Sequence, residues 1–160
     1  MDTTATAAGA AEAQGPARTP VLAVTGAVGR PLRLTVAELR DRWPARTTVA
    51  RFHCVTSGTR LHTFRGPLLR EVLTAAAPEF GPARRKDRSR ALIEVHGEDG
   101  HGTVLSWAEI DEDFGDAPAL LATALDGQPL DACGSQLVVP TDRCGARYIS
   151  GITRVLLSAR

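Results

Sequence analysis

The sequence predicts an α+β domain, rich in β-strands and built on a mixed or barrel-like sheet with one main helix. Three observations predict this class. Seven or eight short segments show the β-branched, aromatic or alternating pattern of strands, with turn residues between them. Only one segment has a clear helical period, and two shorter segments have helix-start signals. Strands and helices do not alternate strictly, which argues against a doubly wound parallel sheet.

The first part of the chain supplies strands and a short helix. Residues 21–29 form a β-rich run broken by glycines. Thr35 and Glu38 have the spacing of a capping box, which predicts a helix to about Arg42. Residues 47–55, "TTVARFHCV", are β-branched and aromatic at alternate places, which predicts a further strand.

The clearest helix is predicted over residues 66–77, "GPLLREVLTAAA". Its leucines and valine repeat at helical spacing. Pro67 suits the first helical position, and Pro78 follows the predicted end.

The second half is predicted to close the sheet. Residues 91–96 and 101–107 read as a hairpin around a Gly-Glu-Asp-Gly turn. Ser106 and Glu109 form a second capping box that opens a short helical turn. Residues 135–157 supply two or three closing strands separated by turns.

Composition excludes several classes of protein. The 160 residues are 43% hydrophobic and 23% charged, as in globular proteins. A chain of this size buries roughly 68–70% of its unfolded surface, so it needs no disulfide or metal to fold. A net charge of +1 gives no overall field for nucleic acid or an anionic membrane. Aromatic residues make up only 4%, which argues against a surface that stacks single-stranded bases.

The organisation predicted is a flexible tail over residues 1–19 and a single domain over 20–160. The first residues lack the basic and apolar regions of a secretory signal, and no run of 18 apolar residues is present. We therefore expect a cytoplasmic protein with three free thiols. A disulfide between Cys133 and Cys144 is disfavoured in that compartment.

Common catalytic motifs do not occur. The sequence has no Cys-x-x-Cys, no His-Glu-x-x-His, no P-loop, no complete Gly-x-Gly-x-x-Gly and no Gly-x-Ser-x-Gly. Candidate chemistry must come from single residues placed by the fold.

Cys54, in "FHCVTSG", is the first candidate. On alternation it shares a face with Ala50 and Phe52, so it is a core residue or a thiolate that ligates a soft metal. His53 points to the opposite face in a regular strand, so the two neighbours make a poor dyad. His62 is a possible base for Cys54 instead.

Two groups of basic residues are candidates for anion binding. Residues 81–90, "GPARRKDRSR", form a loop that either grips a phosphate or carboxylate or is simply solvated. Arg143 and Arg147 bracket a predicted closing turn, where they form an anion site or ordinary surface charge.

The order of the segments resembles the oxidoreductase molybdopterin-binding domain of the sulfite oxidase type, in its short stand-alone form. The resemblance covers about residues 20–158. It rests on "FHCVTSG", "FRGPLLREVL", "IEVHGEDGHGTVLSWAEI", "ALLATALDGQPL" and "GSQLVVPTDRCGARYISGI" in that order. Positions 101 and 136, His101 and Gln136, depart from the residues common in that family.

The resemblance implies a sheet-rich mixed fold and a molybdopterin cofactor. Cys54 matches the cysteine that supplies a thiolate to molybdenum in the catalytic members. Arg51, Arg143 and Arg147 are then the residues expected near the pterin phosphate. The implied activity is oxygen-atom or electron transfer on a small-molecule substrate.

Two other functions stay open. In the first, the chain would be a cofactor-free enzyme or binding protein on the same fold, for example a cyclase or isomerase, with His53, His62 or Arg147 as acid, base or polar groups. In the second, it would be a non-catalytic partner subunit or part of a homo-oligomer. Neither nucleic acid nor a membrane is expected as a partner.

Overall fold

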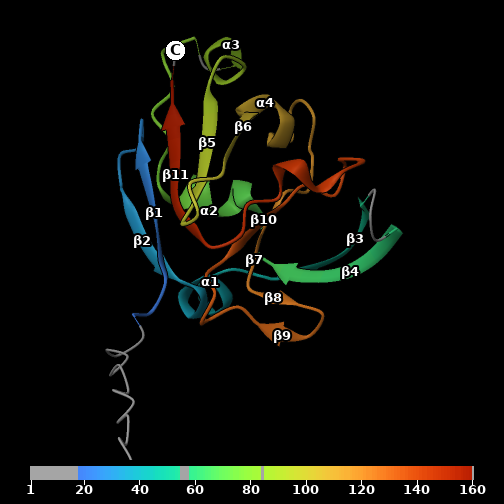
Figure 1. Ribbon diagram of the computed structural model, residues 1–160. Helices are drawn as coiled ribbons and strands as arrows, with labels where there is room; N and C mark the ends of the chain where they lie inside the picture. The colour runs from blue at the N-terminus through green and yellow to red at the C-terminus, as the bar shows by residue number, and fades with distance from the viewer. Residues whose placement is uncertain (1–17, 55–57, 84, 160) are drawn as a thin grey trace, which may run out of the picture.

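Three β-sheets and a few short helices make up the protein (Figure 1). The computed structural model describes residues 18–54, 58–83 and 85–159, and it describes His53 and Cys54 by their backbone alone. The side chains of the predicted site residues His53 and Cys54 therefore lie outside the described part of the chain.

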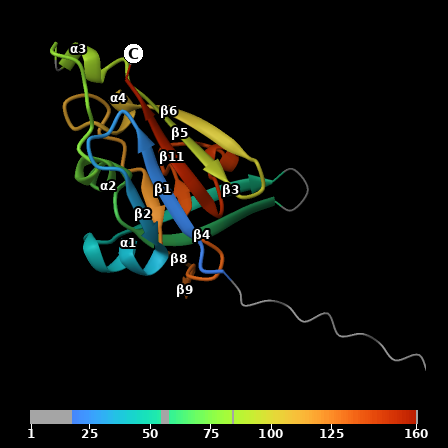
Figure 2. The ribbon, with the colours of Figure 1, turned by 90° about the vertical axis from the view of Figure 1, so that its left-hand side faces the viewer.

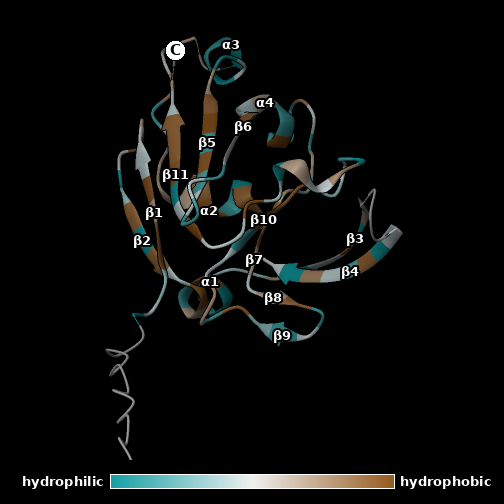
Figure 3. Cartoon of the chain, viewed as in Figure 1, coloured by the Kyte–Doolittle hydropathy of each residue, from teal (hydrophilic) through white to brown (hydrophobic). Residues whose placement is uncertain are grey.

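The largest sheet has five strands in the order β2-β1-β11-β5-β6. Its strands are β1 Val21–Gly26, β2 Leu32–Thr35, β5 Leu92–Gly97, β6 Gly102–Ser106 and β11 Ile152–Ser158. β1 and β11 run parallel, and every other pair is antiparallel. The central strands β5 and β11 are largely hydrophobic in Figure 3, because they lie over the main core.

A second sheet carries the long ribbon that matters for the site. Its order is β3-β4-β8-β9, and a separate pair joins β7 to β10. The bounds are β3 Arg46–Cys54, β4 Gly58–Gly66, β7 Leu120–Ala122, β8 Ala124–Leu125, β9 Gln128–Pro129 and β10 Gln136–Val138. The predicted sheet-rich α+β class is confirmed. In the residues described, these sheets do not join into a closed barrel.

The helices are short, and α1 and α4 begin where the sequence signals them. They are α1 Val36–Arg42, α2 Leu69–Ala75, α3 Arg85–Arg88, α4 Trp107–Ile110 and the 3-10 turn η1 Gly145–Arg147. Both predicted capping boxes are present, at the start of α1 and of α4. No helix in the described ranges is long and apolar enough to span a membrane.

The main predicted helix begins later than expected. Pro67 is not its first residue, because Leu68 has an extended backbone and is the N-cap residue of α2. Leu68 forms an isolated bridge with Leu120, and the Leu69 amide donates to the Ala119 carbonyl at 2.8 Å. These contacts with a remote segment hold the chain extended for one more residue.

Two hydrophobic clusters fill the interior. The larger lies against the five-stranded sheet and includes residues of β1, β5, β11 and α2. The smaller consists of Ala50, Phe64, Leu120, Ala122 and Val138, from the ribbon and the β7–β10 pair. Tyr148 packs against both clusters. The ribbon is therefore joined to the main body through the segment that follows η1.

Candidate functional site

The candidate site lies on the ribbon formed by β3 and β4, which extends away from the body in two views (Figures 1 and 2). The two strands pair along their whole length, and Cys54 lies opposite Gly58 at the far end. Ala50 is 3% exposed, whereas its neighbour Val49 is 61% exposed. The ribbon therefore has an inner face against the protein, which carries Ala50, and an outer face toward solvent, which carries Val49.

Register decides which basic residue shares that face. Arg60 lies directly opposite Phe52, so both are on the inner face. Arg60 is thus a diagonal cross-strand neighbour of Cys54, about 7 Å away between backbone positions. Arg51 lies opposite Leu61 on the outer face and is exposed. Of the arginines predicted near the pterin phosphate, Arg51 therefore lies on the outer face of the ribbon.

Phe52 connects the ribbon to the closing turn. A Cβ atom built on Gly145 would lie 2.4 Å and 2.5 Å from Cε1 and Cδ1 of the Phe52 ring. The turn thus approaches the ring so closely that only glycine fits. The Tyr148 ring meets Phe52 edge-on at a centroid distance of 4.9 Å. The Tyr148 hydroxyl donates to the Val139 carbonyl at 3.0 Å, and burial raises its pKa.

Arg147 is held by two carboxylates. Its Nε and Nη2 donate to the two oxygens of Asp142 at 2.8 and 2.7 Å, and its Nη1 donates to Glu109 at 2.9 Å. These bonds, those to Asp142 first, raise the pKa of Arg147 well above its ordinary value. Arg143, four residues earlier, is exposed and has no partner in the described part of the chain. On this turn, the Arg147 guanidinium is therefore bound to carboxylates, whereas the exposed Arg143 guanidinium could bind an anion.

His62 belongs to a second polar group at the base of the ribbon. Its Nδ1 lies 2.7 Å from Oδ2 of Asp126, whose other oxygen accepts the Thr63 amide at 2.8 Å. The imidazole also meets Phe52 edge-on, at 5.4 Å between centroids. His62 lies opposite Ala50, four positions from Cys54, which is about 13 Å along a strand. The described backbone thus separates His62 from Cys54 by too much for a direct hydrogen bond.

The other two cysteines are free and exposed. Cys144 precedes η1 on the closing turn, whereas Cys133 lies near the end of β9. In the described residues, no group of three His, Cys, Asp or Glu side chains could hold a metal ion. A metal held by a single protein thiolate would leave no such group, so this observation does not bear on Cys54.

Sequence reasoning missed two members of this site as partners of the predicted residues. Asp126 stands before a glycine, a pair typical of a turn, and its 64-residue separation from His62 leaves no local signal of their contact. Arg60 was not selected for the phosphate. Its signal was the pairing of β3 with β4, since the count across the turn fixes which residue lies opposite Phe52.

Comparisons with known proteins agree with the predicted family. The family described as "Oxidoreductase molybdopterin binding domain" matches residues 13–140. A solved structure, the sulfane dehydrogenase SoxCD from Paracoccus pantotrophus, aligns with a TM-score of 0.68 and 21% identity. That alignment covers 88% of this chain but only 38% of the SoxCD chain, so the likeness is one of fold over part of that protein. No curated protein matches the sequence.

Proposed function

Since the chain belongs to the oxidoreductase molybdopterin-binding family, we propose that it is a molybdopterin-dependent oxidoreductase in which Cys54 ligates the metal. One observation supports the proposal: Cys54 ends β3 opposite Gly58, and Arg60 lies opposite Phe52, two residues earlier on β3. Regular alternation would give Cys54 the same face as Phe52 and Arg60. A thiolate is a soft metal ligand, and a neighbouring guanidinium favours the thiolate form.

The residues around this position fit such a cofactor. Arg60 and Arg143 have no ion-pair partner in the described part of the chain, and each could bind two oxygens of a phosphate in a bidentate manner. Arg147 would have to leave Asp142 and Glu109 to do the same, so we assign it the task of fixing the turn. Arg51, on the outer face, would act on the phosphate only through its longer-range field.

The division of work follows from these positions. When bound, the molybdenum cofactor supplies oxygen-atom or electron transfer. Arg60 and Arg143 would bind the anionic groups of cofactor or substrate, while Phe52 and Tyr148 keep water from the inner base of the ribbon. We propose no substrate narrower than a small molecule. The chain covers only 38% of the SoxCD chain, so the substrate of that protein is not transferred to this one.

The test is metal and pterin analysis of protein made in a host that synthesises the molybdenum cofactor. Wild type should contain about one molybdenum and one pterin per chain. Cys54→Ser should lose the metal, whereas Cys144→Ser, the matched control on the closing turn, should keep it. A folded wild-type protein without molybdenum, or equal loss in both variants, would contradict the proposal.

A second candidate function rests on the His62–Asp126 pair. The carboxylate accepts from Nδ1, which leaves Nε2 of the neutral ring as a base beside the aromatic rings of Phe52 and Phe64. This arrangement suits acid–base chemistry on an organic molecule without a cofactor. A metal-free protein whose activity is lost in His62→Gln but kept in Cys54→Ser would favour this function.

A further inference from the structure

A cavity of about 730 Å³ lies beside α3, away from the ribbon. In two views, α3 and the β3–β4 ribbon occupy different ends of the molecule (Figures 1 and 2). The residues that line the cavity are Pro78, Phe80, Gly81, Pro82, Arg85 and Arg88. Its volume is within the range of pockets that take small organic ligands. The basic loop that the sequence singled out therefore borders a real cavity.

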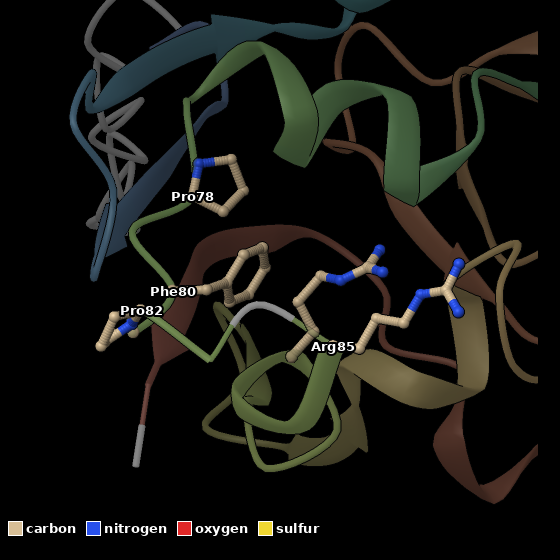
Figure 4. Close-up of a pocket in the computed structure, with 6 residues that line it drawn as sticks. Pro78, Phe80, Pro82 and Arg85 are labelled. Carbon is tan, nitrogen blue, oxygen red and sulfur yellow. The ribbon is translucent and has the colours of Figure 1, made fainter.

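One wall of the cavity is flat and apolar. Phe80 is half-buried, and its ring packs edge-on against the buried Trp107 at 4.9 Å between centroids. Figure 4 shows Phe80 between Pro78 and the Arg85 side chain. Because Trp107 packs against Phe80 and does not line the cavity, Phe80 offers a supported aromatic surface on which a planar ring could stack.

The two arginines of the cavity differ in how firmly they are held. Arg88 donates to the buried Asp111 at 2.7 Å and also to Asp113, and its side chain is 23% exposed. Arg85 is 77% exposed, and its Nε is 3.7 Å from Asp113. An exposed pair at that distance contributes little, so Arg85 can turn to another anion at small cost.

The loop that carries Arg85 is anchored. A Cβ on Gly81 would lie 2.4 Å from Oδ2 of Asp87, so the carboxylate packs directly on the glycine. The same oxygen accepts the Ala83 amide at 2.8 Å, and the Asp87 side chain is 14% exposed. These contacts fix the start of α3 relative to Phe80, so the backbone position that carries Arg85 is set before any ligand binds.

We propose that this cavity binds a small flat aromatic anion, with its ring on Phe80 and its carboxylate or phosphate on the guanidinium of Arg85. Arginine recognises both anions in a bidentate manner, so the shared chemistry is an aromatic ring that bears one of them. Arg88 remains bound to Asp111 and Asp113, so Arg85 is the guanidinium of the cavity that binds the anion. This proposal does not depend on the proposed molybdopterin site, because the two share no residue.

The test uses three probes with the same ring: 2-naphthoate, 2-naphthyl phosphate and the uncharged 2-naphthamide. Binding is followed by NMR titration of the amides of residues 78–90 and by calorimetry. We expect saturable binding of at least one anion and at least tenfold weaker binding of the amide. The tighter of the two anions shows which of the two head groups the cavity prefers.

Variants separate the cavity from general charge. Arg85→Gln should weaken binding of the anion at least tenfold, and Arg85→Lys should restore only part of it. Lys86→Gln removes the same charge from the next residue, which is exposed and outside the lining, and should change affinity less than twofold. Absence of saturable binding to the folded wild type, or equal effects of the Arg85 and Lys86 variants, would overturn the proposal.

Discussion

Replacing Gly145 with alanine tests how tightly the closing turn packs on the ribbon. The new methyl group would lie 2.4 Å from the Phe52 ring, which Tyr148 and His62 border at 4.9 and 5.4 Å. The ring must therefore shift or the turn must withdraw. Overpacking of this kind costs about 1–3 kcal/mol, and the loss of glycine freedom in the unfolded chain offsets about 0.4–1 kcal/mol.

The net expectation for Gly145→Ala is a loss of about 1–2 kcal/mol in the free energy of unfolding. For a chain of this size, that lowers the thermal midpoint by about 2–8 °C in calorimetry. The control is the same change in a Phe52→Leu background, where the smaller side chain leaves room for the methyl group. A full-sized loss in that background, or no loss in the single variant, would refute the contact.

Three further perturbations test other parts of the structure. Arg147→Met should lower the free energy of unfolding by about 1–2 kcal/mol, because Asp142 and Glu109 lose their charged donor, and urea denaturation measures it. The Thr63 amide and the His62 imidazole hold the pKa of Asp126 below its ordinary value. The stability that this carboxylate contributes is therefore fully present above its ordinary pKa and is lost as the pH falls through the folded pKa. Asp126→Asn should therefore lower the thermal midpoint at pH 7, and the difference from wild type should shrink as the pH falls below the ordinary carboxyl pKa; a difference that stays constant over that fall would count against the assignment. Thr35→Ala removes the cap of α1 and should cost about 1 kcal/mol by thermal denaturation, while an unchanged midpoint would contradict the role of the capping box.

Local signals predicted the parts of the fold that depend on neighbouring residues. The capping boxes at Thr35 and Ser106 and the hairpin of β5 and β6 are formed by residues close in sequence. The alternation that placed Ala50 on an inner face of β3 is also local and is confirmed by its burial.

Remote contacts account for what the sequence did not predict. β7 and β8 contain three and two residues, too few to show a period, and their partners β10 and β4 are distant in sequence. The start of α2 was misplaced for the same reason, since the bridge between Leu68 and Leu120 delays it. The basic loop contains a one-turn helix, α3, whose anchor is the contact of Asp87 with Gly81.

The candidate site shows the same division. The family resemblance selected Cys54, and alternation gave its face. Neither signal told Arg51 from Arg60, because that choice needs the register across the ribbon. Likewise, the two carboxylates that hold Arg147 come from a turn and from α4, 38 residues away in the second case.

The most direct test of the account is the pterin content of Arg60→Gln and Arg51→Gln proteins, purified under identical conditions. These residues lie on opposite faces of one ribbon, both are exposed, and both carry the same charge. If the inner face of the ribbon holds the cofactor, Arg60→Gln loses most of the pterin and Arg51→Gln keeps it. Retention by Arg60→Gln with loss from Arg51→Gln, or equal retention by both, would contradict the placement of the site on the inner face.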